Sequence, residues 1–68
     1  QPLSNDELEQ LVKLLADRSN RAGRDVLAFS GASSVAGIVT KIMIADPPER
    51  SVLLIAIRRA LAKARGQV

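Results

Sequence analysis

The sequence lacks cysteine, histidine, tryptophan and tyrosine, and it has a single phenylalanine among its 68 residues. Without cysteine it has no disulfide, and without cysteine or histidine it lacks the side chains that hold most zinc and haem groups. General acid–base chemistry would have to come from seven carboxylates and ten cations. The carboxylates that we can place fall at helix starts or in charge pairs. We therefore expect no enzyme, no cofactor, no metal and no small-molecule substrate.

The hydrophobic residues form 47% of the chain and are almost all aliphatic. The core must therefore consist of leucine, isoleucine, valine and alanine. A chain of this length buries only roughly 60% of its extended surface, so it is marginal as a monomer, and no disulfide or metal compensates. We expect residues 1–68 to form one small helical domain that is completed by dimerisation or by a protein partner.

The net charge and the first residues of the chain give weaker indications of partner and location than the hydrophobic composition gives of the fold. Ten lysines and arginines against seven acidic residues leave a formal net charge of +3. That excess is compatible with nucleic acid but is also ordinary for a soluble domain. The first residues are polar and acidic, unlike a secretory signal, and the first residue is not methionine. We expect a cytoplasmic protein of which this chain is a fragment.

Helix signals divide the chain into four segments. Ser4 and Glu7 have the spacing of a capping box, which starts a helix. Gly31 is a helix stop, and Ser33 or Ser34 begins the next helix. The predicted fold is all-α, a compact four-helix domain with helices near residues 5–18, 22–30, 34–45 and 47–65.

The last helix has the clearest signals. Asp46 is placed to cap it, Pro47 falls at the first helical position, and Glu49 is placed to complete a capping box. Gly66 is placed to end it. Every residue from 52 to 57 is apolar, so we expect this half of the helix to be enclosed on all sides. We expect the third and fourth helices to form the centre of the domain.

The 3.6-residue period predicts which side chains face inward. In the short second helix these are Val26 and Phe29. The other predicted inward stripes are Leu8, Leu11, Val12 and Leu15 in the first helix, Val35, Ile38, Val39, Ile42 and Met43 in the third, and Leu53, Ile57, Ala60, Leu61 and Ala64 in the fourth.

The first functional hypothesis is a non-catalytic interaction or oligomerisation module. The third helix and the first half of the fourth carry more aliphatic surface than the first helix alone covers. Burying such surface against a second copy or a protein partner removes apolar area from water, which is favourable. The residues that we predict for this protein interface are Val52, Leu54, Ile55, Ile44 and Leu14.

The alternative is a helix-turn-helix-like DNA-binding domain that uses helices near 24–30 and 34–45. The second of these helices has small hydroxyl side chains and Lys41, but no Arg, Asn or Gln for bidentate recognition of a base. If nucleic acid is bound, the predicted contacts are Arg18, Arg21, Arg24, Lys41, Arg58, Arg59, Lys63 and Arg65.

A less favoured alternative is a membrane-associated helical segment. Residues 26–45 form a window of 20 residues with the single charge of Lys41, which is long enough to span a bilayer. However, the glycine and hydroxyl residues in this window gather as a turn, and the neighbouring helices have the charged faces of a soluble bundle. We therefore do not expect a membrane partner.

Overall fold

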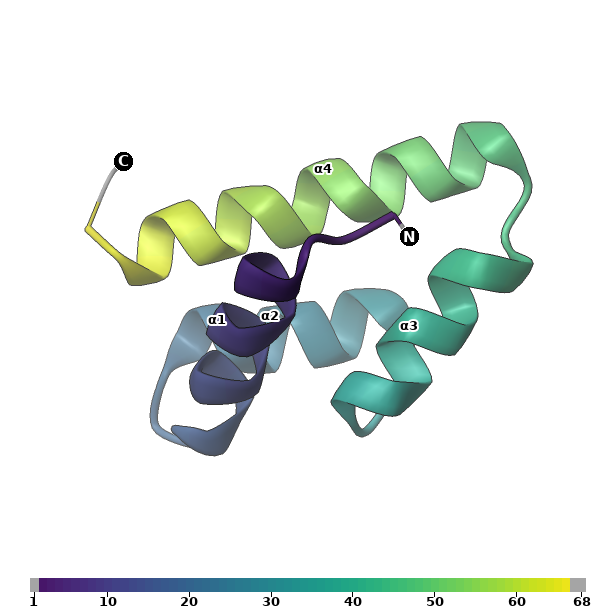
Figure 1. Cartoon of the computed structure of the whole chain (residues 1–68). Helices are drawn as coiled ribbons and strands as arrows, with labels where there is room; N and C mark the ends of the chain where they lie inside the picture. Colours follow the sequence, from purple (N-terminus) through teal and green to yellow (C-terminus); the bar gives the residue numbers. More distant parts are fainter. Residues whose placement is uncertain (1, 67–68) are drawn as a thin grey trace.

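The computed structural model describes residues 2–66, which form four α-helices and contain no β-strand. They are α1 (Asn5–Ala16), α2 (Arg21–Ser30), α3 (Val35–Ile44) and α4 (Pro47–Ala64). Helix α4 runs along one edge of the molecule, and the three shorter helices all lie on one side of it (Figure 1). The predicted all-α, four-helix fold is confirmed.

Local hydrogen bonds begin α1 and α3 as the sequence predicts. The Ser4 hydroxyl accepts a bond from the Glu7 N–H at 3.1 Å, and the Glu7 carboxylate accepts one from the Ser4 N–H at 2.9 Å. At α3, the Ser34 hydroxyl accepts a bond from the N–H of Gly37 at 3.1 Å. Helix α2 ends at Gly31, whose φ of +66° is readily adopted by glycine.

Helix α1 ends two residues earlier than predicted. Asp17 has an extended backbone. Its carboxylate accepts hydrogen bonds from the Ser19 N–H at 3.1 Å and from the Ser19 hydroxyl at 2.6 Å. Such a local turn competes with continuation of the helix, because it satisfies these polar groups in another way.

The start of α4 also differs from the prediction. The Asp46 side chain forms no capping hydrogen bond, so the expected capping box with Glu49 does not form. Pro47 and Pro48 occupy the first two helical positions, and proline has no N–H. An acceptor at Asp46 therefore has fewer N–H groups to cap than at an ordinary helix start.

Arg50 instead joins the end of α3 to the start of α4. Its Nε donates to the carbonyl oxygen of Ile42 at 3.1 Å, and its Nη2 donates to that of Ala45 at 3.0 Å. The last carbonyl groups of a helix have no partner within that helix. Arg50 supplies one and also brings positive charge to the negative end of α3.

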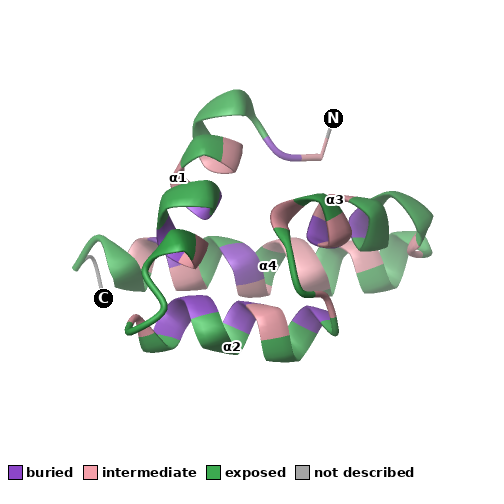
Figure 2. Ribbon diagram, turned by 90° about the horizontal axis from the view of Figure 1, so that it is seen from below, coloured by how far each residue is buried: buried purple, intermediate pink, exposed green. Residues whose placement is uncertain are grey.

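The core is aliphatic, as predicted, and it lies between α4 and the three shorter helices (Figure 2). Leu11, Ile38 and Ile42 are completely inaccessible to solvent. The full set of buried apolar residues is Leu3, Leu11, Leu14, Ala22, Val26, Ile38, Ile42, Ile57 and Leu61.

Helix α2, rather than α3, packs most extensively against α4. It places Ala22, Val26 and Ser30 on one face at successive turns, and all three are buried. Ser30 tolerates burial because its hydroxyl donates to the carbonyl oxygen of Val26 at 2.8 Å. Phe29 lies at the edge of this face and is 55% exposed. The prediction that Phe29 points inward is therefore wrong.

Gly23 is required where α2 meets α1. A Cβ at this position would lie 2.9 Å from the carbonyl oxygen of Leu14, a backbone atom that cannot move aside independently of its helix. Glycine-to-alanine replacement within a helix normally stabilises by about 0.5–1 kcal/mol. Here we predict that Gly23→Ala lowers the free energy of unfolding by about 1–2 kcal/mol, measured by urea denaturation with circular dichroism.

The sign of the change is the test. Ala28→Gly, at an exposed position of the same helix, is the control and should lose about 1 kcal/mol from helix propensity alone. A Gly23→Ala variant that is more stable than the wild type would contradict the close approach of α1 and α2.

Candidate protein-interaction surface

Among residues 2–66, six large apolar side chains are more than half exposed. Three of them, Val12, Phe29 and Met43, were predicted to face inward, but each lies at the edge of its stripe. Single exposed apolar side chains are common on folded proteins, so only those that lie together indicate a binding surface. The exposed fractions are 52% for Val12, 55% for Phe29, 64% for Met43, 75% for Ile44, 55% for Val52 and 52% for Ile55.

Three of these six side chains lie on neighbouring parts of α2 and α4. Val52 and Ile55 are one turn apart, on the side of α4 opposite to the buried Ile57. Phe29 of α2 lines the same hollow as Pro48 and Val52. We call Phe29, Pro48, Val52 and Ile55 the outward strip.

Phe29 stands between two hollows along the boundary of α2 and α4. Their volumes are about 460 Å³ and about 200 Å³. Since Phe29 lines both, the ring flanks α4 over more than one helical turn without being covered. The first hollow is also lined by Ser30, Lys41, Pro48, Glu49, Val52 and Leu53, and the second by Asp25, Val26, Ala56, Ile57 and Ala60.

The exposure of the outward strip follows from how α4 is packed. Ile57 and Leu61 are buried, and Leu53 is half-buried against the core, on the predicted inward side. The other helices all lie on this one side (Figure 1). Residues 52–57 are apolar all round, so one chain alone does not enclose them. The expected enclosure is therefore incomplete within the single chain.

The five predicted interface residues differ in their surroundings. Val52, Ile55 and Ile44 are exposed, whereas Leu54 is half-buried against the core. Leu14 is only 5% exposed and belongs to the core, so it contributes no interface surface. The sequence placed it at the edge of the α1 stripe, but the missing side chain at residue 23 lets α2 approach and bury it.

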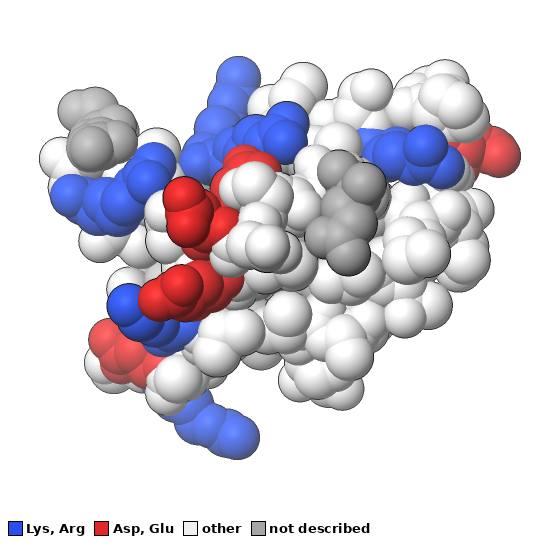
Figure 3. Space-filling model, viewed as in Figure 1, with Lys and Arg blue, Asp and Glu red and all other residues white. Residues whose placement is uncertain are grey.

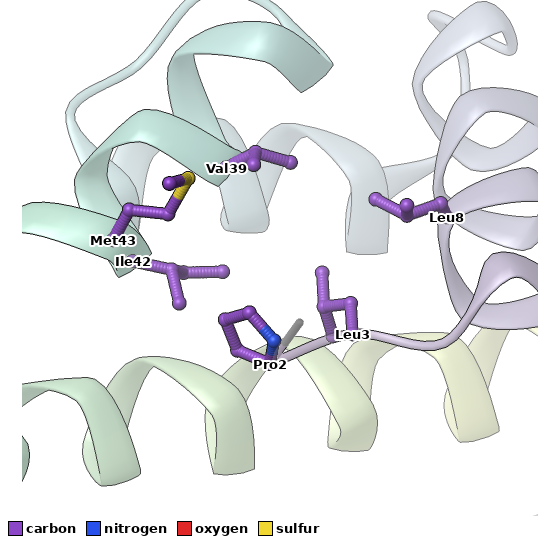
Figure 4. A pocket seen from close by; sticks show the side chains of 6 residues that line it. All are labelled: Pro2, Leu3, Leu8, Val39, Ile42 and Met43. Carbon is purple, nitrogen blue, oxygen red and sulfur yellow. The ribbon is translucent and has the colours of Figure 1, made fainter.

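A separate apolar hollow lies between α1, α3 and the N-terminal segment (Figure 4). It has a volume of about 300 Å³, and charged side chains are sparse over the neighbouring α3 (Figure 3). Among the described residues, the side chains that line it are all apolar, so the hollow offers apolar contact. They are Pro2, Leu3, Leu8, Val39, Ile42 and Met43.

The cations predicted for nucleic-acid contact are spread over the molecule. Arg58 is bonded to Glu7, and Arg65 donates to the side-chain oxygen of Gln10 at 2.9 Å. In the view of Figure 3, acidic and uncharged side chains interrupt the basic ones. The other predicted cations are exposed and lie in three groups, namely Arg18, Arg21 and Arg24 around the start of α2, Lys41 in α3, and Arg59 and Lys63 in α4.

The Arg58–Glu7 pair joins α4 to the start of α1. Arg58 Nε lies 2.7 Å from Glu7 Oε2, and its Nη2 donates to the carbonyl oxygen of Pro2 at 3.2 Å. The pKa of Glu7 is lowered from 4.5 to about 2. The hydrogen bond from Arg58 is the largest cause, and the hydrogen bond from the Ser4 N–H is the second. The partners are 51 residues apart, so no local spacing predicts the pair.

The geometry of α2 and α3 bears on both alternative functions. The two helices are bent by 41° at their junction, whereas the helices of a helix-turn-helix meet at about 90–120°. Within residues 2–66, neither of them nor any other single helix is long and apolar enough to cross a bilayer. Only α2 and α3 taken together reach that length and composition, with the bend between them.

No protein-family model, curated protein or solved structure matches this chain. What the chain does is therefore inferred from its own surface.

The lowered pKa of Glu7 predicts a specific dependence of stability on pH. A depressed pKa means that the ionised carboxylate stabilises the folded chain, fully above pH 4.5 and progressively less as the pH falls through about 2. Glu7→Gln keeps an acceptor for the capping box but removes the charge. Because the Arg58 side chain is 50% exposed, we predict a loss of only about 0.5–1 kcal/mol near neutral pH.

Urea denaturation of the wild type and of Glu7→Gln, between neutral and acidic pH, measures this effect. Glu9→Gln is the control, because Glu9 forms only an exposed pair with Lys13 at 3.5 Å. It should lose about 0.3 kcal/mol and keep the wild-type dependence on acid. If Glu7→Gln keeps the full wild-type acid dependence, Glu7 is not the stabilising carboxylate.

Proposed function

We propose that this chain is a non-catalytic interaction module that binds a helical protein surface through the outward strip. The observation that supports this is that Phe29, Val52 and Ile55 are each more than half exposed. Phe29 and Val52 line one hollow at the boundary of α2 and α4, and Ile55 lies one turn beyond Val52 on the outward side of α4. The neighbouring hollows provide room for side chains of a partner. A helix laid along such a groove is a common mode of protein recognition.

Burial of the outward strip supplies the binding free energy. Apolar area removed from water contributes about 25 cal/mol per Å², so covering the exposed half of one large aliphatic side chain contributes about 1 kcal/mol. Phe29 adds aromatic area and loses little conformational freedom on binding. A partner that covers Phe29, Val52 and Ile55 also compensates for the marginal stability of so short a chain.

Photocrosslinking in the cells that produce the protein tests this function. We replace Ile55 with benzoylphenylalanine, a photoreactive amino acid that the exposed position should tolerate. Because residue 55 lies at the proposed contact, we expect covalent adducts with a protein, either a second copy of the chain or another polypeptide, identified by mass spectrometry.

Val12 provides the matched control, because it is also apolar and 52% exposed but lies on α1, away from the outward strip. The same amino acid at residue 12 should not give the adducts that residue 55 gives. Equal yields at the two positions, or no protein adduct at residue 55, would refute the proposed surface.

Nucleic acid remains the competing partner, and the arrangement of the cations favours it less. Two of the eight predicted cations, Arg58 and Arg65, form hydrogen bonds within the chain. The other six are divided among three separate parts of the surface. Phosphate binding strengthens with the number of cations that contact one duplex. We therefore predict no measurable binding to a mixed-sequence DNA duplex at moderate salt in a fluorescence anisotropy titration. Micromolar binding that weakens steeply with added salt would instead support the DNA-binding alternative.

A further inference from the structure

Two arginines of α4, Arg50 and Arg58, bond to the ends of α3 and α1, and the exposed charged side chains that remain on α4 are ordered by sign along the helix. Asp46 and Glu49 stand at its start, and Arg59 and Lys63 lie in its second half, with the exposed Val52 and Ile55 between them. Figure 3 shows acidic groups at the end of α4 near α3 and most of the basic groups over its other half. All four side chains are exposed, and none is hydrogen-bonded or ion-paired with another described residue.

This order of charges is complementary to that of a second copy of the helix that runs antiparallel to the first. Glu49 lies five residues before position 54 and Arg59 five residues after it, a rise of about 7.5 Å in each direction. Consider a two-fold axis that is perpendicular to the helices and passes beside residue 54. It places Glu49 of each copy at the same height along the helix as Arg59 of the other copy. Asp46 and Lys63, eight residues before and nine after, are nearly matched by the same axis.

The same axis aligns the apolar groups. It brings Val52 of one copy level with Ala56 of the other, and Phe29 flanks both of these positions on α4. In a two-fold antiparallel pair, a group on one flank of the first helix lies on the same flank of the second. The two Phe29 rings therefore lie on one side of the pair and extend the apolar contact beyond α4.

We propose that the occupant of the outward strip is a second copy of this chain, with its α4 antiparallel to that of the first. This inference rests on the proposed interaction function and names its partner. The contact consists of two 18-residue helices, each about 27 Å long, and one phenylalanine from each copy. Such an interface is at the small end of the specific range, so we expect a dimer with a Kd on the order of 10 µM.

Sedimentation equilibrium of the 68-residue chain tests this arrangement by charge exchange. The wild-type mass should rise from 7.3 kDa toward twice that value with concentration. Arg59→Glu or Glu49→Lys alone places like charges together at two symmetric positions, so each should weaken the dimer by about tenfold. The double variant restores opposite charges and should return the Kd to near the wild-type value.

Matched controls separate this effect from net charge and helix stability. Arg21→Glu changes the net charge as Arg59→Glu does, but on α2. Asp6→Lys reverses an acidic residue in the first turn of α1, as Glu49→Lys does in α4. Circular dichroism confirms that each variant is folded. The antiparallel arrangement is overturned if the controls weaken the dimer as much as Arg59→Glu and Glu49→Lys do, or if the double variant is the weakest.

The outcomes also separate this inference from the proposed function. A wild-type chain that stays monomeric at every concentration overturns the dimer. If residue 55 then crosslinks to a different protein in cells, the interaction function stands with another partner. If it crosslinks to nothing, both fail. A dimer that Ile55→Asp abolishes but charge exchange leaves unchanged keeps the outward strip and overturns the antiparallel register.

Discussion

The length of α4 is the constraint on which the rest of the structure depends. It has 18 residues, about 27 Å, whereas α1, α2 and α3 have 12, 10 and 10. These three helices all lie on one side of α4, where they bury Ile57 and Leu61. Since residues 52–57 are apolar all round, their packing leaves Val52 and Ile55 in water. The outward strip is the consequence of packing all three shorter helices on one side of a helix that is apolar all round at these positions.

Two arginines of α4 connect it to the ends of its neighbours. Arg50 satisfies carbonyl groups at the end of α3, and Arg58 binds Glu7 in the capping box of α1. The chain has no disulfide, and the described core contains no aromatic side chain. These contacts therefore fix helix ends that apolar packing alone would leave to solvent. The cations that remain unpaired on α4, Arg59 and Lys63, belong to its outward side and are free to meet a partner.

Interactions between residues close in the sequence predicted the fold, whereas contacts between distant residues determine which side chains are exposed. The Ser4–Glu7 spacing, Ser34 and Gly31 each act within four residues, so they predicted helix boundaries to within about two residues. Leu14 and Phe29 were placed on the wrong sides because both are at stripe edges. Which edge is buried depends on how closely α2 approaches α1 and α4, and that distance is set by residues far apart in the sequence. The arginine contacts of α4 escaped prediction for the same reason.

A dilution series followed by two-dimensional amide NMR tests the central claim, that the outward strip meets a second copy of the chain. We predict that resonances of Phe29 and of the outward side of α4, from Glu49 to Lys63, shift with concentration. Those of Val12 on α1 should stay constant. Spectra that do not change with concentration, or shifts gathered around the hollow between α1 and α3, would contradict it.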